Sequence, residues 1–83
     1  GELKAAESAL EKACRADQKP ARACYQWGRV LQASGRHEAA LQAFAAGPRG
    51  GIDAATLTAR ALSLEALGRY READDAYRAA LAE

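Results

Sequence analysis

The chain has 83 residues, enough for one domain, and a chain of this length buries only about 60% of its unfolded surface. Its 12 basic and 11 acidic residues give a net charge of +1, without the basic excess typical of nucleic-acid-binding proteins. Apolar residues make up 49%, yet no apolar run approaches the roughly 18–20 residues that span a bilayer. We therefore expect no nucleic-acid partner and no membrane span.

The kinds of apolar residue indicate helices throughout. Alanine supplies 23 residues and leucine 9, whereas valine and isoleucine occur once each. Alanine, leucine, arginine, glutamate and glutamine are the strongest helix formers. Taken in chain order, the sequence predicts five helices, over about 2–16, 20–34, 37–46, 54–67 and 70–82. The loops between them are two to seven residues long, so neighbouring helices are predicted to be antiparallel.

Four residues mark the helix ends. Pro20 suits the first turn of the second helix, where its missing N–H needs no partner. Gly35 and Gly68 directly follow periodic apolar segments, where a left-handed backbone closes a helix. Asp53 follows the glycine-rich loop 47–51 and is a good N-cap for the fourth helix.

The second and third helices repeat in the fourth and fifth. Residues 21–46 match residues 54–79 after a shift of 33. The matched pairs are Gly28 and Ala61, Leu31 and Leu64, Gly35 and Gly68, Arg36 and Arg69, Ala40 and Ala73, and Phe44 and Tyr77. A shift of 34 places Ala6 on Ala40, so the first helix is half a repeat. This period, with small residues where paired helices cross, is typical of a helical solenoid.

The motif residues resemble the tetratricopeptide repeat family. Cys24-x-x-Trp27-Gly28-x-x-Leu31 stands where the family has W-x-x-L-G-x-x-Y, and Ala40-x-x-x-Phe44 matches A-x-x-x-F. The resemblance implies one all-α domain over 1–83, with a half repeat at 2–16 and repeats at 20–46 and 54–82. The chain departs from the family pattern at three places. Arg60 stands where the family has an apolar residue, Gly47 replaces the usual alanine, and the closing proline is missing before Ile52.

Two cysteines lie five residues on either side of the first turn. Cys14 and Cys24 are thus placed to face one another, and a disulfide and a pair of buried thiols both fit. Their spacing is not C-x-x-C, and with the single His37 they do not form a zinc site. The surrounding residues also resemble, more weakly, secreted cysteine-rich Sel1-like repeats. A bond implies a periplasmic or exported protein, and free thiols a cytoplasmic one.

No group of residues predicts catalysis. His37 lies at the turn between paired helices, and Tyr70 occupies the matching position in the second repeat, so we interpret His37 as a residue that packs at the turn. Asp74 and Asp75 are adjacent and point about 100° apart on a helix, which suits contacts with neighbouring arginines better than acid–base work. The glycine-rich loop follows a helix and lacks the lysine of a phosphate-binding loop. We therefore expect a non-enzymatic protein with no cofactor and no metal.

The family resemblance implies that the first helix of each pair lines a concave groove for a protein or peptide. The side chains expected there are Arg22, Tyr25, Gln26, Arg29, Gln32, Thr58, Leu62 and Glu65. Arg22, Gln26 and Arg29 share one helical face, and arginine forks bind carboxylates, so an acidic segment or a C-terminal carboxylate is the expected ligand. Thr58 and Leu62 do not supply the full carboxylate clamp of chaperone-binding members. A merely solvated face is the alternative.

A structural role is the alternative function. The sequence begins with half a repeat and stops after a second helix, and a terminal repeat usually needs a polar outer face. Tyr70, Tyr77 and Leu81 are expected to form one uncovered stripe on the last helix. This pattern predicts self-association, or a segment of a longer repeat scaffold in a bacterial, possibly periplasmic, assembly.

Overall fold

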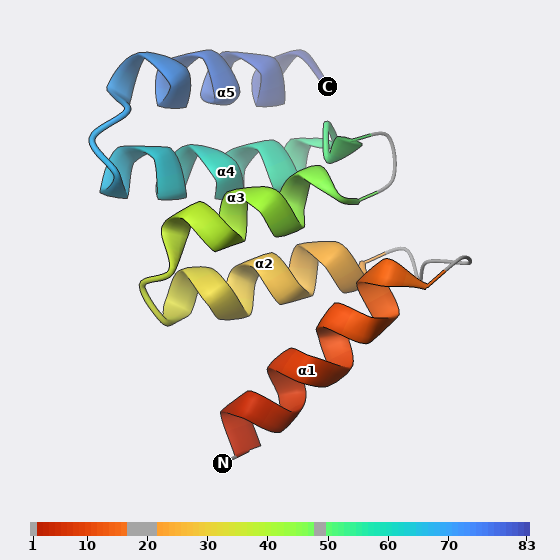
Figure 1. The fold of residues 1–83 in the computed structure, drawn as a ribbon. Coiled ribbons are helices and arrows are strands. Elements are labelled where there is room, and N and C mark those ends of the chain that lie inside the picture. Colours follow the sequence, from red (N-terminus) through yellow and green to blue (C-terminus); the bar gives the residue numbers. More distant parts are fainter. Residues whose placement is uncertain (1, 17–21, 48–49) are drawn as a thin grey trace.

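The computed structural model describes residues 2–16, 22–47 and 50–83, and every regular element in these segments is a helix. The five helices are α1 (Glu2–Arg15), α2 (Ala23–Ala33), α3 (His37–Ala45), α4 (Ala54–Ala66) and α5 (Tyr70–Ala82). Helices α2 to α5 lie side by side with alternating direction, and the two termini lie at opposite ends of the stack (Figure 1). The predicted all-α fold of antiparallel helix pairs is confirmed.

Helix α2 begins later than predicted. The expected start, Pro20, lies outside the described residues, and Arg22 has a non-helical backbone with φ −121° and ψ 7°. The carbonyl of Arg22 accepts the N–H of Gln26 at 2.9 Å, so Arg22 is the N-cap and the helix begins at Ala23. The other helix ends agree with the prediction to within one residue.

The turns inside the two repeats have the same geometry. Gly35 and Gly68 take φ of 79° and 78°. The next residues, Arg36 and Arg69, take φ and ψ of −92° and 68° and of −91° and 67°. Each of these arginines donates its backbone N–H to a leucine carbonyl five residues earlier, at 2.9 and 2.8 Å. Both turns therefore close their helices with a Schellman motif, and the 33-residue period holds in the backbone.

The first repeat is tightly packed where α2 crosses α3. Phe44, Leu31, Ala40 and Ala43 are buried there, together with a residue of α4. A Cβ on Gly28 would lie 2.3 Å from Cε1 of Phe44, so only glycine allows this approach. The prediction that small residues mark the helix crossing is confirmed here.

The second repeat has its own cluster, in which Ala61, Leu64, Ala73 and Ala76 are buried. Tyr77 packs against this cluster and donates its hydroxyl proton to a carboxylate on α4. The expected uncovered stripe on α5 is therefore wrong for Tyr77, because its ring turns inward as that of Phe44 does. Its two companions, Tyr70 and Leu81, remain 69% and 87% exposed.

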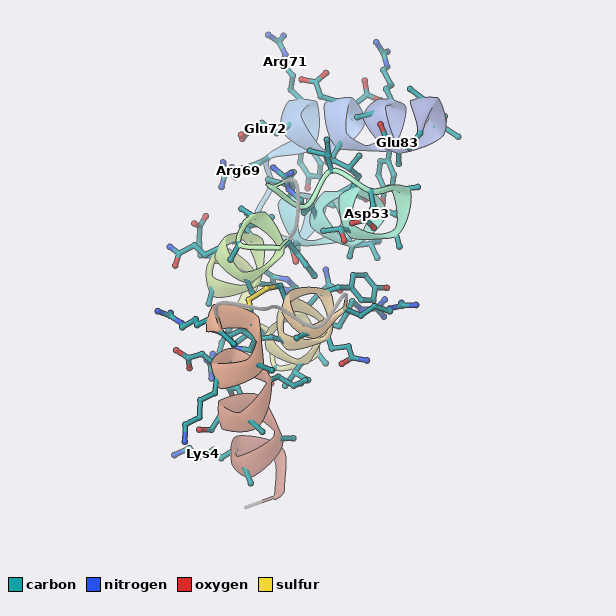
Figure 2. The ribbon with its side chains drawn as sticks, turned by 90° about the vertical axis from the view of Figure 1, so that its right-hand side faces the viewer. Lys4, Asp53, Arg69, Arg71, Glu72 and Glu83 are labelled. Atoms are coloured by element: carbon teal, nitrogen blue, oxygen red, sulfur yellow. A yellow bond between two sulfur atoms is a disulfide. The ribbon has the colours of Figure 1, made fainter. Side chains whose placement is uncertain are left out.

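The helices of the stack lie on two opposite sides. Seen from the side, α2 and α4 lie on one side of the stack and α3 on the other (Figure 2). Gln32 joins α2 to α4, because its amide donates to Ala59 O at 2.6 Å and to Ser63 Oγ at 2.8 Å. No helix in the described segments is long and apolar enough to cross a membrane.

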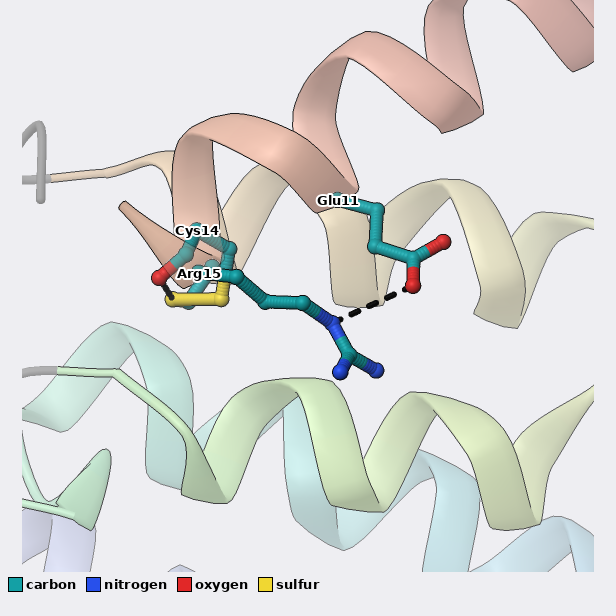
Figure 3. The surroundings of a disulfide bond; sticks show 4 residues. Glu11, Cys14 and Arg15 are labelled. Atoms are coloured by element: carbon teal, nitrogen blue, oxygen red, sulfur yellow. Dashed lines mark hydrogen bonds and ion pairs between the residues drawn. A yellow bond between two sulfur atoms is a disulfide. The ribbon is translucent and has the colours of Figure 1, made fainter. Parts of the chain in front are cut away.

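Helix α1 is inclined to the rest and attached covalently. A disulfide joins Cys14 to Cys24, and both residues are buried (Figure 3). Arg36 also reaches back from the turn of the first repeat to form an ion pair with Glu7. The sequence allowed either a disulfide or two buried thiols at these positions, and the structure has the disulfide.

Candidate partner-binding face

Tyr25 lies between two arginines on the exposed side of α2. The guanidinium carbon of Arg22 lies 5.0 Å from the centre of the Tyr25 ring, and that of Arg29 lies 5.9 Å from it. Arg29 also donates from a terminal nitrogen to the Tyr25 hydroxyl oxygen at 3.0 Å. Contacts of this kind stabilise a cation over the ring face, and among the described residues they leave other N–H donors of both arginines available to an external acceptor.

The local sequence explains this arrangement. Positions 22, 25 and 29 are three and four residues apart, so they share one face of the helix. Tyr25 is half-buried, and its ring lies 6.2 Å from that of Phe44 in a tilted contact. The ring is thus fixed by the core of the first repeat, and the arginines are fixed by the ring.

The start of α4 lies next to this group. A hollow is lined by Arg22, Tyr25, Asp53, Ala55 and Thr56. The backbone N–H of Thr56 donates to Asp53 Oδ1 at 3.0 Å and lowers the pKa of that carboxyl below its ordinary value. The hydroxyl of Thr56 and the charge of Arg22 lower the pKa further, although burial opposes them. Asp53 is therefore the N-cap that the sequence predicted, and it stays ionised beside the arginine.

The other predicted binding residues fall into two groups. Gln26 and Leu62 are exposed, Leu62 to 47%, and Thr58 is exposed with its hydroxyl donating to the carbonyl of Ala54. Gln32 and Glu65 are already engaged, Gln32 with α4 and Glu65 as the acceptor of the Tyr77 hydroxyl. We call the remaining exposed set the α2–α4 face; it comprises Arg22, Tyr25, Gln26, Arg29, Thr58 and Leu62.

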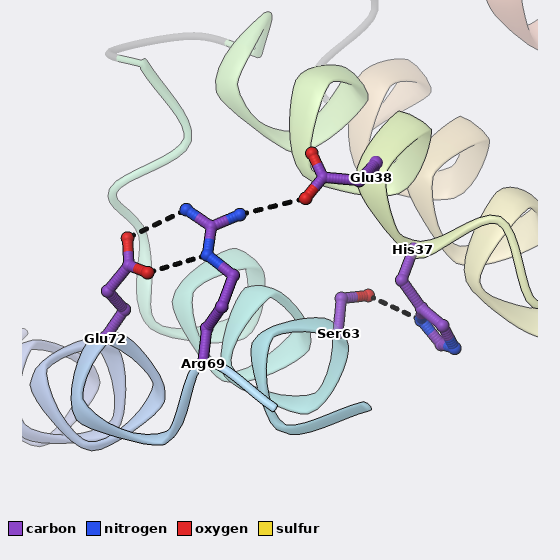
Figure 4. A network of polar contacts seen from close by, with 5 residues as sticks. All are labelled: His37, Glu38, Ser63, Arg69 and Glu72. Atoms are coloured by element: carbon purple, nitrogen blue, oxygen red, sulfur yellow. Dashed lines mark hydrogen bonds and ion pairs between the residues drawn. The ribbon is translucent and has the colours of Figure 1, made fainter. Parts of the chain in front are cut away.

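Sequence reasoning missed the role of Ser63. This residue is fully buried in α4, where its hydroxyl lies 2.8 Å from Gln32 Nε2 and 3.2 Å from His37 Nδ1 (Figure 4). His37 is thus the turn residue that the sequence predicted, and its partner comes from the next repeat. The matching position in the first repeat is Val30, so the 33-residue comparison gave no signal for a polar contact.

A charged network links the two repeats on the side of α3. Arg69 donates from Nε and a terminal nitrogen to Glu72 at 2.6 and 2.8 Å, and from the other terminal nitrogen to Glu38 at 3.0 Å (Figure 4). The hydrogen bonds from Arg69 lower the pKa of Glu72, and those to Glu72 raise the pKa of Arg69. Along α5, Arg78 pairs with Asp74 at 3.1 Å, one of the contacts expected for the two aspartates.

The described residues contain no group of three histidine, cysteine, aspartate or glutamate side chains placed to hold a metal ion. His37, the one histidine of the chain, contacts a serine hydroxyl rather than a carboxylate that would orient it as a base. The distinctive polar arrangement is therefore the arginine–tyrosine group of the α2–α4 face.

Comparison with known proteins agrees with this architecture. A family model described as a tetratricopeptide repeat matches residues 21–46 and 54–82, which are the two full repeats of the structure. The comparisons with curated proteins and with solved structures give no significant match. The weaker resemblance to Sel1-like repeats stays an expectation. With most of its length matched, and with the helix pairs and turns of the repeat in place, the chain belongs to the tetratricopeptide repeat family.

Proposed function

We propose that this chain binds a protein or peptide segment on its α2–α4 face, and that the segment presents an acidic side chain or a C-terminal carboxylate to Arg22 and Arg29. Tetratricopeptide repeats are in general protein–protein interaction modules. The observation that carries the proposal is the fixed Tyr25 ring with an arginine against it on either side. Prearranged forks lose little side-chain entropy when they bind a carboxylate.

The neighbouring groups define what fits. Leu62 offers an apolar contact on α4, and Tyr25 offers the edge of a flat ring. Asp53 holds a negative charge beside Arg22 and repels a ligand carboxylate on that side, so the carboxylate lies nearer to Arg29 than to Arg22. The face therefore suits a segment in which an acidic group adjoins an apolar one.

The test is a matched pair of charge reversals. Peptides are first selected from a random display library on the wild-type protein, and their affinities are then measured by fluorescence anisotropy. We expect Arg29→Glu to weaken acidic binders at least tenfold, because one attractive contact becomes repulsive. Arg71→Glu makes the same charge change on the outer side of α5, where Arg71 points away from the stack (Figure 2), and should leave affinity unchanged.

Circular dichroism of both variants checks that the fold is intact, since Arg29 and Arg71 are both exposed. Equal affinity of the wild type and Arg29→Glu for every selected peptide contradicts the proposal. An equal loss in Arg29→Glu and Arg71→Glu also contradicts it, because the effect is then one of net charge alone.

Self-association is the second candidate function, as part of a repeat scaffold or through the chain's own ends. It is favoured by the exposure of Tyr70 and Leu81 on α5. Two copies would cover these side chains by stacking end to end, since solenoid repeats contact only their neighbours. A concentration series in sedimentation velocity tests it: a strictly monomeric chain at millimolar concentration rules it out.

The disulfide supports a place in an oxidising compartment such as a periplasm. A thiol count on native protein prepared without reductant tests this inference. We expect no free thiol, and two free thiols per chain contradict it.

A further inference from the structure

A hollow of about 540 Å³ lies between α3, α4 and α5. Apolar side chains line part of it: Leu41, Leu57 and Leu64. Arg60, in the middle of α4, lines it too. This arginine is half-buried, and its Nε is buried without a hydrogen-bond partner among the described residues. A volume of this size suits a small ligand or a few side chains of a partner.

The repeat itself shows how unusual this arrangement is. The residue 33 positions before Arg60 is Trp27. In the first repeat, Trp27 packs against the buried clusters that contain Cys14 and Phe44. The second repeat therefore places a guanidinium beside open space at the position where the first repeat packs an indole. Nε1 of Trp27 is likewise buried without a partner among the described residues, so what sets Arg60 apart is its charge, which none of the ion pairs among the described residues neutralises.

The other charges around the hollow are largely neutralised. Arg69 is held by Glu38 and Glu72 at the rim. Outside this network, the charged residues that line the hollow are Arg60 and Asp75. Asp75 is exposed on α5, so solvent screens its charge more than that of the half-buried Arg60.

We propose that this hollow is a second binding site, which takes a peptide segment with a single acidic side chain flanked by apolar ones. The apolar side chains lie against the three leucines, and the carboxylate accepts from the terminal nitrogens of Arg60, since its Nε is itself buried. The site differs from the α2–α4 face: Figure 2 shows Arg69 and Glu72, at its rim, on the side of α3, and Asp53 on the other side.

The rim limits what the hollow accepts. Glu38, Glu72 and Asp75 line the hollow together with two guanidiniums, of which Arg69 is already paired with Glu38 and Glu72. A segment with several adjacent acidic residues is repelled by these carboxylates more strongly than a single carboxylate among apolar neighbours. The site is therefore selective for sparse rather than dense negative charge.

The test uses three capped pentapeptides in NMR titrations of the full chain: Gly-Leu-Glu-Leu-Gly, its glutamine counterpart, and Gly-Glu-Glu-Glu-Gly. We expect the first to shift amide signals of residues 57–64, and the other two to bind at least tenfold more weakly. Arg60→Leu removes the guanidinium and should abolish the shifts while the melting temperature stays equal or rises. Arg71→Leu, an equal loss of charge at an exposed site, should leave them unchanged.

Arg60→Lys is the second variant, because it keeps the charge and loses the planar fork of guanidinium donors. We expect it to weaken binding of the glutamate peptide several-fold. The proposal is overturned if no shifts occur at 57–64 at millimolar peptide, or if Arg60→Lys and Arg60→Leu bind like the wild type. If Arg29→Glu abolishes peptide binding and Arg60→Leu leaves it unchanged, the peptide binds at the α2–α4 face, and the proposal of a second site is also overturned. The reverse pattern supports this site whether or not the α2–α4 face binds a partner.

Discussion

The two full repeats share one sequence pattern and one turn geometry, yet they are buried to different depths. Phe44 in the first repeat is fully buried, whereas its equivalent in the second, Tyr77, is only half-buried. The first repeat lies between α1 and α4, and the second has a described neighbour on one side only. Position in the stack therefore sets how much each equivalent residue contributes, as expected where repeats contact only their neighbours.

The difference also explains the choice of aromatic residue. A phenylalanine suits a place with no water, whereas a tyrosine suits one where its hydroxyl finds a partner, here Glu65. The hydrogen bond to Glu65 raises the pKa of Tyr77 above its ordinary value, so the hydroxyl keeps its proton to a higher pH than a free tyrosine does. The two equivalent positions thus differ in burial, and the tyrosine hydroxyl has a hydrogen-bond partner where the phenylalanine needs none.

The largest effect is expected from truncating the buried aromatic residue. Phe44→Ala should lower the free energy of unfolding by about 3–5 kcal/mol, because it opens a cavity between α2, α3 and α4. Tyr77→Ala removes the equivalent side chain and should cost clearly less, since part of its ring already meets water. Urea denaturation of both variants measures the difference. Equal losses contradict the claim that stack position sets the contribution.

Releasing α1 should make the first repeat more like the second. The disulfide closes a loop between positions ten residues apart, and its removal in Cys14→Ser/Cys24→Ser should cost about 2–3 kcal/mol. The loss should fall mainly on α1, because the clusters around Phe44 and Leu64 do not depend on the bond. Hydrogen exchange by residue measures this: equal loss of protection in α1 and α5 contradicts it.

The two repeats also differ in how closely their helices approach, because Gly28 lacks the Cβ atom that Ala61 has at the equivalent position. Gly28→Ala should destabilise by about 1–2 kcal/mol net, because crowding against Phe44 outweighs the helix propensity gained. The equivalent residue in the second repeat is already alanine, Ala61, which is buried in the second cluster, so that crossing accommodates a methyl group. Thermal denaturation of a double variant, Gly28→Ala with Phe44→Leu, tests whether crowding against Phe44 causes the loss. Gly28→Ala should cost less stability in the Phe44→Leu background than in the wild type. An equal cost in both backgrounds shows that contact with Phe44 is not the cause.

The smallest effect concerns the N-cap of α4, which has no counterpart in α2. Asp53→Ala should cost about 1 kcal/mol at pH 7. The folded-state pKa of Asp53 is lowered, so its stabilisation is present above the ordinary carboxyl pKa and is lost as pH falls through the folded value. Asp53→Asn keeps the cap without the charge. The stability difference between Asp53→Asn and the wild type should therefore stay constant down to about pH 4 and shrink as the pH falls further. A difference that stays constant below about pH 4 contradicts this.

Much of the fold was predictable because it depends on local signals. Gly35 and Gly68 act through backbone conformation alone, Asp53 caps α4 by accepting the N–H three residues later, and α5 has the predicted bounds. The state of the cysteines was not predictable, since their equal distance from a turn allows both a bond and a pair of thiols.

The binding residues were only partly predictable. Helical spacing brought Arg22, Tyr25 and Arg29 together, as the sequence indicated. The engagement of Gln32 by the next repeat could not be foreseen, because its partners lie 27 and 31 residues away in the chain. The hollow beside Arg60 depends on three helices at once, and the sequence showed only that the residue departs from the repeat pattern.

Binding at the α2–α4 face is tested most directly by mapping which residues a bound peptide contacts. The measurement is an NMR titration with a library-selected peptide whose affinity depends on Arg29. We expect the largest amide shifts at residues 22–29 and at the start of α4, with little change in α5. Largest shifts in α3 or α5, with residues 22–29 unaffected, would contradict the central claim that the α2–α4 face is where this tetratricopeptide repeat protein holds its partner.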